Sequence, residues 1–92
     1  MQPRQQLILM DKVIRQLDDI KKSQTSVLKK ISQVEADNIN LGLEILNDSL
    51  PALHEEVDNS IQKVSTLIEQ FTDNRNEFLK NNPGADSEAP AQ

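Results

Sequence analysis

Apolar side chains recur along the first half of the chain at alternating spacings of three and four residues. Nine of the eleven positions in this ladder are apolar, and the two exceptions are Gln24 and Asn38. A sustained period of 3.5 residues predicts an α-helix whose apolar stripe faces another helix. The ladder consists of Met10, Val13, Leu17, Ile20, Gln24, Val27, Ile31, Val34, Asn38, Leu41 and Ile45.

A second ladder with the same spacing follows in the second half of the chain. It consists of Leu50, Leu53, Val57, Ser60, Val64, Leu67, Phe71, Asn74 and Phe78, and Ile61 and Ile68 widen its stripe. The two ladders predict an all-α fold, a long helix plus a second helix, arranged as a helical hairpin or coiled coil. The interaction seam is predicted to hold the whole first ladder and, from the second, Leu53, Val57, Val64, Leu67, Phe71 and Phe78.

Proline and capping residues predict the helix boundaries. Pro3 is tolerated in a first helical turn, and the first helix is expected over about 4–47. Asp48 or Ser49 can cap a second helix, with Pro51 in its first turn, over about 50–80. The sequence from Asn81 to Gly84 is a strong stop signal. We therefore expect one helical domain over 1–82 and a disordered tail over 83–92.

A turn near Gly42 is the alternative. Ile39, Leu43 and Leu46 lie off the first ladder and extend the second one backwards. The apolar face therefore rotates before Gly42. A proline inside a helix costs about 3 kcal/mol and a glycine about 1 kcal/mol, so the break is expected at 48–50. A third possibility is one long bent helix in a parallel dimer.

Gln24 and Asn38 are polar residues in an otherwise apolar ladder, two heptads apart. A polar side chain in a seam needs a hydrogen-bond partner, which it finds only in one register and oligomeric state. These residues are predicted to set register. The alternative is that each lies in a frayed or part-exposed stretch.

Composition narrows the class of protein. The chain has 92 residues, two Phe as its only aromatic residues, and no Cys. So small a chain buries little surface alone, which favours an oligomer or a partner. The longest apolar run, Leu7 to Met10, is far shorter than a membrane span or a signal-peptide core. We expect a cytoplasmic protein, or one exported without a cleaved signal.

Charge is unevenly distributed along the chain, whose net charge is −5. Residues 1–30 hold seven Lys and Arg against three Asp, whereas residues 31–92 hold twelve acids against three basic residues. An antiparallel hairpin or a head-to-tail assembly would use such a division to set orientation. With a turn at 48–50, Lys29 and Lys30 are expected to approach Glu69.

The residues that carry enzyme chemistry are scarce. His54 is the single histidine, Cys is absent, and no glycine-rich phosphate loop is present. His54 and Asp58 have the spacing of two ligands on one helix face, which is too few for a metal site. We predict no catalytic residues, no metal, no cofactor and a non-enzymatic protein.

Four lysines occur in two pairs, Lys21-Lys22 and Lys29-Lys30. The pairs are eight residues apart and are therefore expected on one helix face. That face could contact phosphate on a nucleic acid or an anionic membrane. The chain is acidic and places no aromatic residue among these lysines for base stacking, so nucleic acid is not the expected partner.

The stretch from Leu17 to Ile31, LDDIKKSQTSVLKKI, resembles the Ser-Gln-centred heptads of snapin and related small subunits of lysosome-related-organelle biogenesis complexes. That resemblance implies a rod-like helical protein that assembles with other coiled-coil subunits and adapts endosomal membranes to transport machinery. Length and acidity also resemble the secreted helical hairpins of the WXG family. In that case Leu41-Gly42-Leu43 would form the turn, although the family's Trp is absent.

Together these patterns predict a coiled-coil assembly or adaptor subunit whose partners are other helical subunits or further copies of itself. The alternatives are a secreted hairpin that partners an effector, and a helix that binds phosphate or a membrane surface.

Overall fold

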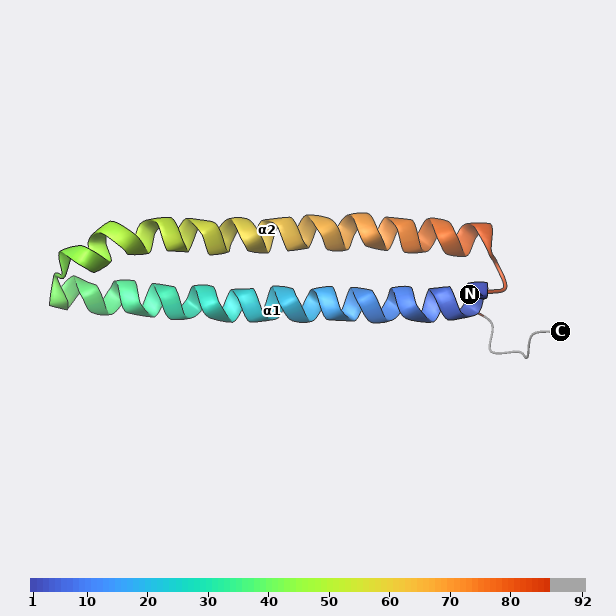
Figure 1. The fold of residues 1–92 in the computed structure, drawn as a ribbon, viewed down its shortest axis with the longest axis horizontal. Helices are drawn as coiled ribbons and strands as arrows, with labels where there is room; N and C mark the ends of the chain where they lie inside the picture. Colours follow the sequence, from blue (N-terminus) through green and yellow to red (C-terminus); the bar gives the residue numbers. More distant parts are fainter. Residues whose placement is uncertain (87–92) are drawn as a thin grey trace.

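Two long antiparallel helices form the molecule. The computed structural model describes residues 1–86, with α1 over Pro3–Leu41 and α2 over Glu44–Asn81. The helices lie side by side along their whole length, so that the start of α1 and the end of α2 meet at one end (Figure 1). The extents are 68 × 18 × 16 Å, a rod one helix pair wide. The predicted all-α helical hairpin is confirmed.

The hairpin turns at Gly42. This glycine has φ +64°, a left-handed conformation that an L side chain disfavours and that commonly ends a helix. Its N–H donates to the carbonyl oxygen of Asn38 at 2.7 Å. Leu43 is the N-cap of α2, and its carbonyl oxygen accepts from the N–H groups of Leu46 and Asn47 at 3.2 and 3.1 Å.

The Asn38 side chain ties the two sides of the turn together. Its Oδ1 accepts from the Leu43 N–H at 2.9 Å, while its Nδ2 donates to the Leu43 carbonyl at 3.3 Å and to Asn47 Oδ1 at 2.7 Å. Asn38 is only 4% exposed. Leu43 is the N-cap of α2 and has no side chain that could accept a hydrogen bond. Asn38 instead holds the backbone N–H of this N-cap residue from α1.

The predicted break at 48–50 is wrong. Asp48, Ser49 and Leu50 lie within α2, and Pro51 is inside the same helix. A helix-breaking proline favoured the break, but the turn at Gly42 has a positive-φ glycine and three hydrogen bonds of one Asn to stabilise it. The first turns of α2 run at an angle to the rest of the helix, as Figure 1 shows, and this is how a helix accommodates a proline.

Three contacts between the helices set their register: Asn38 with Asn47, Glu35 with His54, and Asp11 with Arg75. Each step back along α1 is matched by a step forward along α2. The half-buried or buried residues of α1 accordingly include one complete heptad pattern that faces α2: Leu7, Met10, Ile14, Leu17, Lys21, Gln24, Leu28, Ile31, Glu35 and Asn38. Those of α2 that face them are Leu50, His54, Val57, Ile61, Val64, Ile68, Phe71, Arg75 and Phe78.

The core between the helices is thin. Leu7, Ile31 and Leu50 are its buried apolar residues on the two helices, and none of the side chains in residues 1–86 reaches complete burial. A single seam between two helices leaves each helix covered on one side only. The isolated hairpin therefore buries little apolar surface for its size.

The end of α2 is followed by a turn over residues 83–86. Asn82 Nδ2 donates to the Phe78 carbonyl at 3.0 Å, and the Ala85 N–H donates to the Asn82 carbonyl at 2.9 Å. Ala85 is buried. This ordered turn corrects the predicted disordered tail over residues 83–86, and the remainder of that tail, 87–92, lies outside the described residues.

Replacing Gly42 with Ala should lower the free energy of unfolding by about 1–2 kcal/mol, because Ala must adopt a left-handed conformation there. The space around Gly42 is open, so a steric clash makes no contribution. Gly84, which also has open space and does not have a positive φ, is the matched control, and Gly84→Ala should change stability little. Thermal and urea unfolding followed by circular dichroism at 222 nm measures both. Equal effects of the two variants would contradict this account of the turn.

Replacing Asn38 with Ala should lower the free energy of unfolding by about 1–3 kcal/mol, because three part-buried hydrogen bonds to Leu43 and Asn47 are lost. Asn40, two residues further on and exposed, provides the control, and Asn40→Ala should stay within about 0.5 kcal/mol of wild type. A stability of Asn38→Ala equal to that of Asn40→Ala would show that the turn forms without this side chain.

Candidate helix-docking interface

The first ladder of the sequence divides between two directions in space. Met10, Leu17, Gln24, Ile31 and Asn38, which alternate along it, are half-buried or buried and face α2. The residues between them lie to one side of α2: Ile20, Val27 and Val34 are exposed, Val13 is half-buried, and Leu41 beside the turn is exposed. One seven-residue repeat therefore forms the hairpin, and the other lies along its side.

The second ladder divides in the same way. Val57, Val64, Phe71 and Phe78 face α1, whereas Leu53 and Leu67 are exposed. Ile45, predicted to end the first ladder, lies on α2 instead and is 72% exposed.

The exposed repeats of the two helices lie on the same side of the hairpin. In an antiparallel pair, a rotation by 180° exchanges the helices and leaves each side of the pair in place. In every heptad of each helix, one position directly precedes a seam position. On both helices these positions therefore lie on the same long side of the pair. We call this side the apolar edge; it consists of Val13, Ile20, Val27, Val34 and Leu41 on α1 and Leu46, Leu53, Ser60 and Leu67 on α2.

The apolar edge is accessible over most of its length. Ile20, Val27, Val34, Leu53 and Leu67 are each between 42% and 46% exposed. The register places Ile20 level with Leu67 and Val34 level with Leu53, so the exposed side chains form pairs across the edge. From Val13 to Leu41 the edge is about 42 Å long at 1.5 Å per residue.

A shallow hollow continues the apolar edge towards the open end of the hairpin. Its lining is apolar except for Gln6, and it includes Val13 of the edge and Met10 and Phe71 of the seam. Leu9 and Met1 complete it. The exposed apolar surface thus extends beyond the two repeats.

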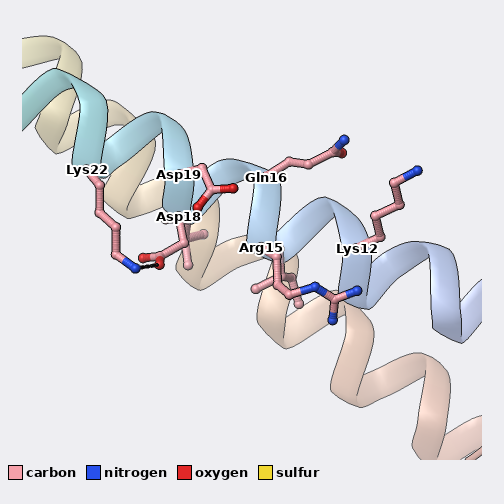
Figure 2. A pocket seen from close by; sticks show the side chains of 8 residues that line it. Lys12, Arg15, Gln16, Asp18, Asp19 and Lys22 are labelled. Atoms are coloured by element: carbon pink, nitrogen blue, oxygen red, sulfur yellow. Dashed lines mark ion pairs between the residues drawn. The ribbon is translucent and has the colours of Figure 1, made fainter.

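The opposite long side is polar over its middle. It carries Asp11, Asp18 and Thr25 on α1 and Asp58, Ser65 and Thr72 on α2, and we call it the polar edge; apolar residues of the same repeats lie only at its ends, Ile39 near the turn and Leu79 near the open end. Figure 2 shows the α1 part of this region, with Lys12 and Gln16 pointing away from α2 and Lys22 reaching Asp18 one turn away. The Lys22–Asp18 distance is 3.0 Å, and the hydrogen bond raises the pKa of Lys22 above its ordinary value. The two long sides of the hairpin therefore differ in chemistry.

Arg75 joins the helices near their open end. Its Nε donates to Asp11 Oδ1 at 2.9 Å and its Nη2 to Asp11 Oδ2 at 3.4 Å. The hydrogen bond to Asp11 raises the pKa of Arg75 above its ordinary value. This register contradicts the expected approach of Lys29 and Lys30 to Glu69, because the turn at Gly42 places Lys29 level with Glu56 instead.

His54 contacts α1 and not its own helix. Its Nδ1 lies 2.8 Å from Glu35 Oε1, and both side chains are about one-third exposed. Asp58, the residue that spacing suggested as its companion, forms a hydrogen bond with Gln62 at 3.2 Å. Within residues 1–86, no group of three His, Asp or Glu side chains is arranged to hold a metal ion.

Both polar residues of the first ladder lie in the seam between α1 and α2. Asn38 is buried and hydrogen-bonded across the turn, and Gln24 is half-buried and level with Ile61. Lys21 is a further polar residue of this seam, level with Val64.

The four lysines do not form one basic face. Lys21 is half-buried against α2, whereas Lys22, Lys29 and Lys30 are exposed. Lys22 and Lys29 are seven residues apart and lie beside the polar edge, and Lys30 lies on the side of the apolar edge. A phosphate-binding patch made of all four lysines is therefore not assembled.

The sequence analysis missed one of the two heptad positions that α1 contributes to the seam. Leu7, Ile14 and Leu28 face α2 and were not among the predicted seam residues. They too are spaced at multiples of seven, but charged residues, Lys21 and Glu35, continue their repeat and obscure it.

No helix in residues 1–86 is long and apolar enough to cross a membrane. Comparison with protein-family models, with curated proteins and with solved structures finds no match to the chain. The resemblances to snapin-like subunits and to WXG-family hairpins stay predictions.

The ion pair between Asp11 and Arg75 should give a measurable coupling energy. In a double-mutant cycle of Asp11→Ala and Arg75→Ala we expect roughly 0.5–1 kcal/mol, because the guanidinium makes two hydrogen bonds at a part-buried site. Asp19, on the outer surface of α1 two turns away, is the control, and its cycle with Arg75 should give no coupling. Unfolding in urea measures all the variants. A coupling energy for Asp19 as large as that for Asp11 would contradict the register.

Proposed function

We propose that this protein is a non-enzymatic coiled-coil assembly or adaptor subunit, and that it acts by docking its apolar edge against further helices in a multiprotein complex. The observation that carries the proposal is the row of half-exposed Ile, Leu and Val side chains along one side of the hairpin, formed by Ile20, Val27, Val34, Leu53 and Leu67. Extended exposed apolar surfaces bordered by polar residues are typical of protein interaction sites.

The energetics support a docked state. Complete burial of a Val, Leu or Ile side chain stabilises by about 1.5–3 kcal/mol, and the edge side chains have nearly half of their surface left to bury. Five such residues contribute several kcal/mol, which is comparable with the cost of associating two molecules. The seven-residue spacing matches the interdigitation that a further helix requires.

The setting of such a subunit follows from the resemblance of residues 17–31 to snapin-like proteins. On that basis the complex would be one that adapts endosomal or lysosomal membranes to transport. In this setting the chain would contribute contacts between subunits, which is consistent with its rod shape.

A second candidate is a secreted hairpin that partners an effector. The turn at Leu41-Gly42-Leu43 supports it, because this is where the WXG-family resemblance places the turn. Tracking the chain in culture supernatant and in cells of its source organism separates the two candidates: recovery outside intact cells favours the secreted hairpin, and retention in the cytoplasm favours the assembly subunit.

The edge can be tested by changing its polarity. An edge variant with Ile20→Ser, Val27→Ser and Val34→Ser should remain a helical hairpin, because these residues lie outside the seam, and it should leave the native complex. The measurement is gel filtration of extracts from source cells that express the tagged chain, with circular dichroism of the purified variant as the check on folding.

The matched control changes the polar edge. Lys22→Ser with Lys29→Ser alters the same helix on its other side and should elute with the wild-type complex. Equal elution of the folded edge variant and the wild type would overturn the proposal, and so would release of the control.

A further inference from the structure

Charge is divided along the length of the hairpin, between its turn end and its open end. Residues 31–62, which form the turn half, contain no Lys or Arg and seven acids: Glu35, Asp37, Glu44, Asp48, Glu55, Glu56 and Asp58. The other described residues contain all ten Lys and Arg of the chain and seven acids. The rod is therefore acidic at the turn end and basic at the open end.

This division is a consequence of the turn position. Because the chain folds at Gly42, the acidic end of α1 and the acidic start of α2 lie at the same end of the rod. Within the hairpin each helix thus places like charges beside like charges near the turn. Lys29 and Lys30 lie level with Glu56 at the border of the acidic half, whereas the remaining Lys and Arg are too far from the acids next to the turn to interact strongly across solvent.

We infer that a second copy of this chain covers the apolar edge, antiparallel to the first, so that two hairpins form a four-helix bundle. The inference rests on the proposed function, since it names the helices that the edge docks against. In this arrangement the acidic turn half of each copy lies over the basic open half of the other. A parallel pair would place the two acidic ends together, an arrangement that electrostatic repulsion disfavours.

The middle of the charge division coincides with the middle of the apolar edge. Val27 is the central member of its repeat, and the register places it level with Ser60. The acidic stretch begins after Lys30 on α1, three residues from Val27 towards the turn, and it ends before Lys63 on α2, three residues from Ser60 towards the open end. The boundary therefore crosses the rod obliquely and is centred on the level of Val27 and Ser60. A two-fold axis through Val27 therefore aligns the apolar edges and exchanges the charged halves at once.

The individual side chains agree with this axis. Val27 would meet Val27 of the second copy, and Ile20 would meet Val34. On α2, Leu53 would meet Leu67. Glu56 and Lys63 border the edge one turn on either side of Ser60, so Glu56 of each copy would lie level with Lys63 of the other. These pairings place apolar groups on apolar groups and opposite charges at the border.

Single cysteines test the arrangement cleanly, because the chain has none of its own. Purified Val27→Cys should form a disulfide-linked dimer under mild oxidation. Ile20→Cys and Val34→Cys should each form little linked dimer alone and should link to one another when mixed. The exposed Ser26→Cys, on the outer surface of α1, is the control and should remain largely unlinked at the same concentration.

The oligomeric state provides the second measurement. Light scattering with refractive-index detection on the purified wild-type chain should give twice the monomer mass of 10.4 kDa. Val27→Lys should raise the dimer dissociation constant at least about tenfold, because it places two like charges at the centre of the contact. The wild-type dimer should weaken as salt rises from low to moderate concentration, because its halves attract.

Three results would overturn the inference. Linking of Val34→Cys with Leu53→Cys in place of Ile20→Cys would show a parallel pair. Equal linking of Ser26→Cys and Val27→Cys would show that the dimer does not use the apolar edge. A purified chain that stays monomeric at all concentrations would show that another helical protein covers the edge; the proposed function would survive that result and would fail only if the folded edge variant stayed in the native complex.

Discussion

The side chain of Asn38 is the interaction on which the arrangement of this hairpin depends. It accepts from the N–H of Leu43, the N-cap of α2, and donates to Asn47, so it fixes where the chain reverses and how the two helices begin to pair. An asparagine in an apolar ladder costs stability unless its partners are in place. Here the partners exist only when Gly42 adopts its left-handed conformation, and turn and register are therefore specified together.

The register determines which apolar residues find a partner within the chain. Starting from Asn38 and Asn47, each heptad of α1 places two residues against α2, and the ion pair of Asp11 with Arg75 maintains the same register near the other end. Val27 and its repeat are left on one long side because a second helix can cover only two positions of each heptad. Each helix has an apolar stripe that spans three positions of the heptad, and the other helix covers two of them. The third positions form the apolar edge.

Much of the fold could be predicted from the sequence, since a 3.5-residue ladder specifies helices that pack on helices. The position of the turn could not, because Pro51 and Gly42 were compared by their intrinsic helix costs alone. The structural context reversed the outcome of that comparison. The helix α2 bends near Pro51 and so accommodates it, while Asn38 stabilises the turn at Gly42 with hydrogen bonds that no propensity scale includes. Pairing Asn38 with Asn47 across Gly42, nine residues apart, was the signal that could have identified the turn.

The same limit applies to the interface. A heptad ladder does not distinguish contacts within a chain from contacts between chains, because both require the same spacing. Only the register separates Ile31, which is buried against α2, from Val34, which remains exposed one turn away. Charge behaves likewise: a basic first third and an acidic remainder suggested attraction between the two helices, but a fold at Gly42 brings the acids of both helices to one end. That division leaves each hairpin complementary to a reversed copy of itself, and the apolar edge lies where such a copy would meet it.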